Sequence, residues 1–133
     1  MNSDKTYIGK KVLVVDDEQI AGRLFASNIR DLGFQVDLEH YSPNAITTYF
    51  EHGRDYGIVV TDVQMPIRDG IELAEALKHI ARQEQWRTPR IYAHTASPGV
   101  NEYLRAIQER GIVDFVSSKR DFLKNFRKFL MEL

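Results

Sequence analysis

Short apolar runs alternate with amphipathic stretches along the chain. Residues 12–15 and 58–60 are continuous apolar runs, the pattern of strands buried on both faces of a parallel sheet. Weaker strand patterns are the alternating pair Val36 and Leu38, residues 91–93 and residues 113–116. The period of the pattern therefore switches repeatedly between that of a strand and that of a helix.

Amphipathic helical patterns follow each predicted strand. Five helices are expected, at residues 20–32, 43–52, 73–81, 100–110 and 122–133, with Ile20 and Leu24 on the apolar face of the first. The last has the strongest apolar stripe, with Lys124, Arg127 and Lys128 on its other face. Five strand-helix units predict an α/β fold, a single doubly wound parallel sheet with helices on both faces.

Composition limits the chain to one domain and gives no global attraction to a partner. The 133 residues carry a formal net charge of -1, so nothing draws the chain to nucleic acid or to an anionic membrane. There is no cysteine, which excludes disulfides and thiolate metal sites. Residues 1–10 are expected to be a polar tail without a signal-peptide core, residues 11–133 the domain, and the cytoplasm its location.

A polar residue or pair follows four of the apolar runs. Asp16 and Asp17 follow the first predicted strand, Asp62 the third, Thr95 the fourth and Lys119 the fifth. The carboxyl ends of parallel strands share one edge of a sheet, so these side chains are expected to meet. A hard cation relieves repulsion between adjacent carboxylates, and a carboxylate can attack phosphorus where positive charge is present. The pattern indicates a phosphoryl and Mg²⁺ site.

Each of these residues also has a simpler explanation. Asp16 and Asp17 could cap the following helix, Asp62 could be a turn aspartate, Thr95 a structural strand residue and Lys119 a solvated charge. Four independent coincidences would be needed for all of these explanations to hold together. The histidines show no metal-ligand spacing and are expected at the surface or in ordinary packing: His40, His52, His79 and His94.

Two strings of the sequence, Val-Val-Asp-Asp-Glu and Thr-Asp-Val-Gln-Met-Pro-Ile-Arg-Asp-Gly, resemble the receiver domain of two-component response regulators. The resemblance covers nearly the whole chain and implies a flavodoxin-like sheet of order 2-1-3-4-5. It implies that Asp62 is the phosphoacceptor, that Asp17, Asp62 and the backbone carbonyl of Gln64 bind Mg²⁺, and that Asp16 acts through metal-bound water. Thr95 and Lys119 are then expected to contact the phosphoryl group.

The resemblance also implies partners and a mode of action. A sensor histidine kinase or histidine phosphotransfer protein would donate the phosphate, and the domain would hydrolyse its own acyl phosphate without being an enzyme toward other substrates. The phosphoryl group would alter the face made by the fourth and fifth strands and helices, through which a homodimer is possible. The downstream effector is open, as is whether the domain stands alone or belongs to a larger regulator or hybrid kinase.

Two departures from the family pattern concern the loop at Lys119. The family usually has a proline with a cis bond after this lysine, where the chain has Arg120, and a trans bond is expected because a cis bond without proline costs about 3 to 4 kcal/mol. The family's switch aromatic stands three residues before the lysine, where the chain has Val116, preceded by Phe115. Either a one-residue insertion restores Phe115 to that place or the aromatic is missing.

Two other functions remain open at this stage. One is a phosphorylation-independent interaction module built on the same fold. The other is an aspartyl-phosphate hydrolase of the haloacid dehalogenase type, which requires an acid two residues after the nucleophile, where this chain has Gln64.

Overall fold

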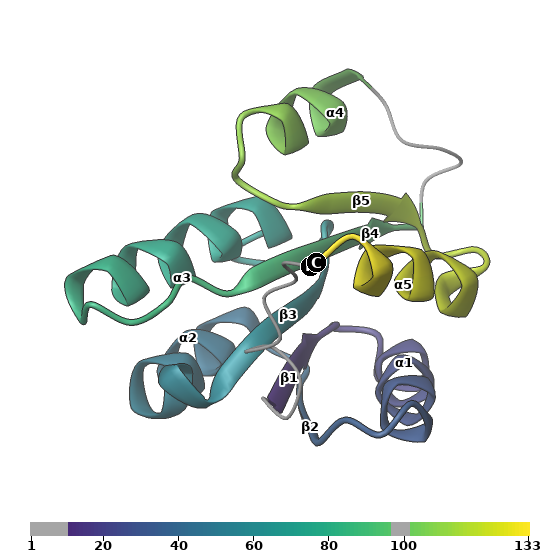
Figure 1. The fold of residues 1–133 in the computed structure, drawn as a ribbon, viewed down its shortest axis with the longest axis horizontal. Coiled ribbons are helices and arrows are strands. Elements are labelled where there is room, and N and C mark those ends of the chain that lie inside the picture. The colour runs from purple at the N-terminus through teal and green to yellow at the C-terminus, as the bar shows by residue number, and fades with distance from the viewer. Residues whose placement is uncertain (1–10, 97–101) are drawn as a thin grey trace.

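A single parallel sheet forms the centre of the protein (Figure 1). The computed structural model describes residues 11–96 and 102–133. The strands are β1 (Lys11–Val15), β2 (Val36–Glu39), β3 (Tyr56–Asp62), β4 (Arg90–Thr95) and β5 (Phe115–Ser118). They pair in parallel in the order β2-β1-β3-β4-β5. The predicted doubly wound sheet and its strand order are confirmed, while the predicted tail at 1–10 lies outside the described residues.

Helices cover both faces of the sheet. They are α1 (Gln19–Asp31), α2 (Ser42–His52), α3 (Gly70–Gln83), α4 (Glu102–Glu109) and α5 (Phe122–Met131), with a short 3-10 turn, η2 (Gly53–Asp55), before β3. In Figure 1, α1 and α5 lie on one side of the sheet and α2 and α3 on the other. Val100, predicted to begin the fourth helix, lies outside the described residues.

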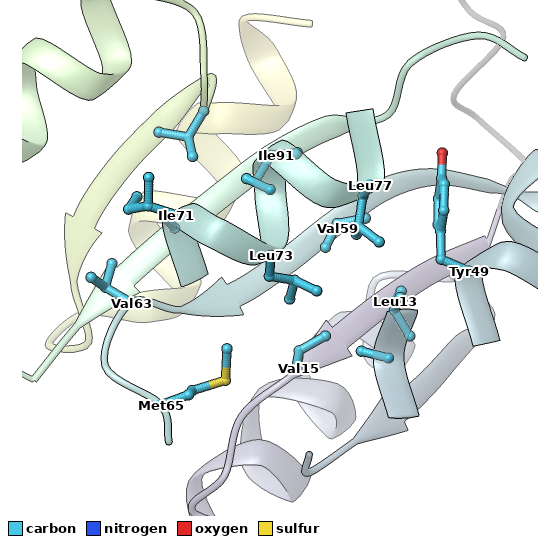
Figure 2. Close-up of a cluster of buried hydrophobic side chains, with 14 of the residues drawn as sticks. Leu13, Val15, Tyr49, Val59, Val63, Met65, Ile71, Leu73, Leu77 and Ile91 are labelled. Carbon is cyan, nitrogen blue, oxygen red and sulfur yellow. The ribbon is translucent and has the colours of Figure 1, made fainter. Parts of the chain in front are cut away.

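Alternating residues of the central strands belong to two separate hydrophobic clusters, one on each face of the sheet. In β1, Leu13 and Val15 pack toward α2 and α3 (Figure 2). Val12 and Val14 pack toward α1 and α5 on the other face. All four are fully buried. This is why β1 is apolar without interruption, since a strand covered on both faces has no solvent-facing position.

Two details of the predicted elements are wrong. The fifth strand begins at Phe115, because the Asp114 side chain accepts the amide hydrogen of Ile91 (2.8 Å) where strand pairing would otherwise start. Val113 is buried but precedes the strand. In α1, Ile20 and Leu24 are 83% and 57% exposed, because the face turned to the sheet is instead formed by Gly22, Phe25, Ala26 and Ile29.

The segment after α3 folds back onto η2. Trp86 packs edge-on against Tyr49 of α2, with ring centroids 5.9 Å apart. A Cβ atom at Gly53 would collide with both rings, so only glycine allows this close approach. The contact joins the ends of α2 and α3 nearest the start of β3.

Candidate functional site

Polar side chains converge where β1, β3 and β5 end. The carboxylates of Asp16, Asp17 and Asp62 each offer an oxygen within 4.8 Å of the others. The Lys119 ammonium lies 3.1 Å from Asp16 Oδ2 and 3.3 Å from Asp62 Oδ2. Thr95 ends β4 beside them, and its carbonyl accepts the amide hydrogen of Lys119 at 2.8 Å. The five residues singled out from the sequence therefore lie at one sheet edge.

Asp16 is held by the turn that leads into α1. It is fully buried, and its Oδ1 accepts a hydrogen bond from the backbone N–H of Glu18 at 2.9 Å. The helix cap position is Glu18, which makes no side-chain capping bond. Asp17 is exposed to solvent at this turn. Asp16 thus orders the turn, while Asp17 remains accessible to solvent beside it.

Asp62 is placed by the loop that joins β3 to α3. Its side chain is 5% exposed, and its Oδ1 accepts the amide hydrogen of Gln64 at 3.3 Å. A Cβ atom at Gly70 would collide with the carbonyl oxygen of Asp62, so this loop can close only with glycine there. Asp69 and Glu72 form a reciprocal capping box that fixes the start of α3.

Lys119 is shared by three carboxylates. Besides Asp16 and Asp62, its ammonium contacts Glu18 Oε1 at 2.9 Å. Burial alone would lower the pKa of Lys119, but the three carboxylates more than offset burial, and the net pKa is raised. The sequence gives no sign of this Glu18 contact, because it depends on a lysine 101 residues away.

The two buried acids are not fully compensated by that single cation. Burial, together with the charge of Asp16, raises the pKa of Asp62 to about 6 despite the lowering effect of Lys119. Burial likewise raises the pKa of Asp16. Asp16 Oδ2 is buried and, among the described residues, forms no hydrogen bond beside its ion pair with Lys119. A second cation that prefers oxygen ligands would offset the remaining negative charge of these carboxylates, so the donor set fits Mg²⁺.

An open hollow lies next to the carboxylates. It has a volume of about 470 Å³ and is lined in part by Gln64 and Met65 of the β3–α3 loop, Thr95 of β4 and Tyr103 of α4. The hollow gives a small anionic group room to approach the strand ends from the side of α4.

The loop at Lys119 has ordinary backbone geometry. No cis peptide bond occurs within residues 11–96 and 102–133, so the Lys119–Arg120 bond is trans, as expected from the absence of proline. Two residues further on, Asp121 adopts a left-handed conformation with φ of 56° and leads into α5.

The register of β5 shows whether Phe115 or Val116 stands in the place of the switch aromatic, three residues before Lys119. Phe115 pairs with Tyr92 and stacks on its ring at 5.2 Å, within the cluster beneath α5. Val116 pairs with Ala93 and packs in the opposite cluster, on the face of the sheet that also carries Thr95. Strand pairing continues without a bulge to Ser118, so no inserted residue restores Phe115 to the place three before Lys119. Val116 occupies that place.

His94 lies directly beneath the acidic cluster. Its ring is fully buried and packs against Phe25, with centroids 4.6 Å apart, and its Nε2 lies 3.9 Å from Asp16 Oδ2. Burial, together with the nearby charge of Lys119, lowers the pKa of His94 to about 3. The sequence placed His94 among packing residues, which is correct, but gave no sign that it adjoins Asp16.

The sequence matches a known domain family and named relatives. The family model for the response regulator receiver domain matches residues 12–125. The transcriptional regulatory protein PcoR of Escherichia coli is 27% identical over 122 residues, 85% of this chain and 46% of that protein. Hybrid signal transduction histidine kinase L of Dictyostelium discoideum is 29% identical over 123 residues, 89% of this chain and 7% of the kinase. The chain therefore spans less than half the length of these relatives.

Solved structures share the fold. Chemotaxis protein CheY4 of Vibrio cholerae has a TM-score of 0.77 at 19% identity, over 93% of this chain and 98% of that one. The response regulator TrrA of Thermotoga maritima, solved in complex with Mg²⁺ and BeF, scores 0.73 at 22% identity over 92% and 97%. The receiver domain of Saccharomyces cerevisiae Ssk1, in a co-crystal structure with the phosphotransfer protein Ypd1, scores 0.72 at 20% identity over 87% and 82%.

Proposed function

Because the chain belongs to the response regulator receiver domain family of two-component systems, we propose that it accepts a phosphoryl group on Asp62 beside a bound Mg²⁺. The observation that carries the proposal is the position of Asp62, buried at a strand end between Asp16 and the Lys119 ammonium. A carboxylate at this position can attack phosphorus, because the nearby positive charge offsets its repulsion from the phosphate oxygens.

The ligands for Mg²⁺ would be Asp17, Asp62 and the backbone carbonyl of Gln64, with Asp16 acting through a water molecule. The ion would neutralise the phosphoryl oxygens during transfer. Asp62 forms the new bond to phosphorus while the bond from phosphorus to the donor's histidine nitrogen breaks. Water later hydrolyses the acyl phosphate, which releases inorganic phosphate and restores the carboxylate.

The donor would be a sensor histidine kinase or a histidine phosphotransfer protein. Support comes from the relative named as a hybrid histidine kinase and from the Ssk1 receiver domain solved with a phosphotransfer protein. We place the domain at residues 11–133 and its activity in the cytoplasm. Within the part of the chain that the structure describes, no helix is long and apolar enough to cross a membrane.

Phosphorylation would be read out through α4, β5 and α5. Thr95 and Lys119 would turn to the phosphoryl oxygens and favour one of two conformations of this face, which an effector or a second copy of the chain then recognises. The response needs no direct contact with nucleic acid.

A phosphorylation-independent interaction module is the second candidate, and one observation favours it. Val116 fills the place that the family gives to a switch aromatic, so the usual side chain that couples the site to this face is replaced by a smaller one. The acidic cluster and Lys119 favour the phosphorylated switch.

The experiment is incubation with Mg²⁺ and a small phosphodonor, followed by intact mass measurement. Wild-type protein should gain one phosphate, Asp62→Ala none, and Asp31→Ala, a control at the exposed far end of α1, should gain one. Equal labelling of wild type and Asp62→Ala would overturn the assignment of Asp62. Amide NMR spectra with beryllofluoride and Mg²⁺ separate the two candidates, because shifts confined to the acidic cluster favour the inert module.

A further inference from the structure

Two buried polar groups face each other below the acidic cluster without forming a hydrogen bond. His94 and Asp16 are each 0% exposed, and His94 Nε2 lies 3.9 Å from Asp16 Oδ2. Among the described residues, neither ring nitrogen of His94 has a hydrogen-bond partner, and Asp16 Oδ2 forms an ion pair with Lys119 but no hydrogen bond. A buried polar group without a hydrogen bond is costly, and a fully buried position such as that of His94 would normally be filled by an apolar residue.

Aromatic packing fixes the plane of the His94 ring. Phe25 of α1 meets it edge-on at 4.6 Å, Phe122 of α5 lies 5.7 Å away, and Tyr92 lies 6.1 Å away on the same strand. Phenylalanine could make similar contacts without burying nitrogen atoms. Packing alone therefore does not explain why the residue is a histidine.

Asp16 depends on a cation that the proposed reaction would draw away. Its Oδ2 is paired with the Lys119 ammonium at 3.1 Å, and the same ammonium serves Glu18 and Asp62. A phosphoryl group on Asp62 adds anionic oxygens that compete for this ammonium. Asp16 Oδ1 keeps its bond from Glu18, but Oδ2 then requires another donor.

We propose that His94 is a positioning residue that donates its Nε2–H to Asp16 Oδ2 once Lys119 turns to the phosphoryl group on Asp62. The bond requires closing the present separation by about 1 Å to reach hydrogen-bond distance. Its effect is to hold the Asp16 carboxylate in the orientation that serves the Mg²⁺ site. The proposal rests on the proposed function and adds a residue to it.

The direct test is a long-range ¹H–¹⁵N spectrum of the His94 ring in wild-type protein, without ligand and with Mg²⁺ and beryllofluoride. We expect the Nε2–H tautomer in both states, and an Nε2 proton that moves downfield when beryllofluoride binds, because the new hydrogen bond is shorter. An Nδ1–H tautomer, or an unchanged Nε2 proton, overturns the proposal. The measurement requires no substitution.

A variant series tests the consequence. His94→Phe keeps the ring packing and removes the donor, whereas His94→Gln keeps a donor on a flexible side chain. The concentration of Mg²⁺ that half-saturates the beryllofluoride-bound spectrum should rise about fivefold in His94→Phe, the effect of losing one ordinary hydrogen bond. It should rise less in His94→Gln. The proposal would be overturned if wild type and a folded His94→Phe reach half-saturation at the same Mg²⁺ concentration.

Failure of the proposed function and failure of the role of His94 give different experimental results. If wild-type protein gains no phosphate from a phosphodonor, the proposed function fails and His94 has no role of this kind. Wild-type protein could instead be phosphorylated on Asp62 while the Nε2 proton of His94 stays unchanged and His94→Phe needs no more Mg²⁺ than wild type. In that case only the role of His94 fails.

Discussion

The Lys119 ammonium lies 3.3 Å from Asp62 Oδ2 although the peptide bond that follows Lys119 is trans. The lysine reaches the site because its backbone N–H is bound to the carbonyl of Thr95, which continues the pairing of β4 and β5 by one residue. The replacement of proline by Arg120 therefore does not remove Lys119 from Asp62.

Loss of the Lys119 ammonium should slow phosphorylation of Asp62. Lys119→Gln removes the only lysine contact to the acidic cluster in the described residues, and a charge-assisted hydrogen bond of about 1.5 to 3 kcal/mol corresponds to roughly a 10- to 100-fold loss of rate. The measurement is the rate of mass gain with a small phosphodonor at saturating Mg²⁺. Lys124→Gln, on the exposed face of α5, should match wild type. Equal rates for Lys119→Gln and wild type would contradict the role given to Lys119.

Mg²⁺ should stabilise the protein through Asp17. At a concentration 100 times its dissociation constant, a ligand that binds only the folded state adds about 2.7 kcal/mol to the free energy of unfolding. Asp17→Asn should abolish most of this gain and, because Asp17 is exposed, change the metal-free stability by less than about 0.5 kcal/mol. Urea unfolding with MgCl₂ and with EDTA measures both. Asp31→Asn, at the far end of α1, should keep the full gain; the site assignment fails if both variants behave alike.

Asp62 should destabilise the metal-free protein at neutral pH. Its pKa is raised to about 6 in the folded state from an ordinary 3.8, so the folded protein binds more protons than the unfolded chain between these values. The cost of the buried carboxylate is therefore absent below about pH 4 and complete above the folded pKa. Asp62→Asn should be more stable than wild type by at most about 3 kcal/mol at pH 7.5, and equal to it near pH 3.5. Urea unfolding in EDTA at both pH values checks this, and a difference that does not vary with pH would contradict it.

Phe115 should matter for stability and not for phosphorylation. It stacks on Tyr92 beneath α5, on the face of the sheet opposite Thr95, so Phe115→Leu should lower the free energy of unfolding by about 1 to 2 kcal/mol. Its rate and extent of mass gain with a phosphodonor should equal those of wild type. The same two measurements on Val116→Ala, which alters the neighbouring residue on the Thr95 face of the sheet, serve as the comparison. A slower phosphorylation of Phe115→Leu with unchanged stability would place Phe115 at the site after all.

The sequence predicted the sheet and the convergence of the candidate site residues, because both depend on local patterns. Each strand is an apolar run, each acid or hydroxyl follows one directly, and the geometry of a parallel sheet brings strand ends together. The fifth strand was misplaced because Val113 is apolar and buried, and only the Asp114 bond to Ile91 shows that pairing starts later.

Contacts between distant segments were not predictable. Glu18 lies at the start of α1 and is 63% exposed, but Lys119 reaches it from the other end of the chain. His94 carries no sign in its neighbours that Asp16 lies beside it. The choice between Phe115 and Val116 depends on register, which decides the face of every side chain in a strand.

The position of Trp86 determines which structural changes the intrinsic fluorescence of the protein can report. It is the single tryptophan of the sequence, and it rests on Tyr49 and Gly53, where α2 and α3 end and β3 begins. The acidic residues stand at the opposite end of β3. Intrinsic fluorescence should therefore report unfolding of the domain while staying nearly silent when Asp62 is modified, and an emission change on phosphorylation would mean that the rearrangement crosses the whole length of the sheet.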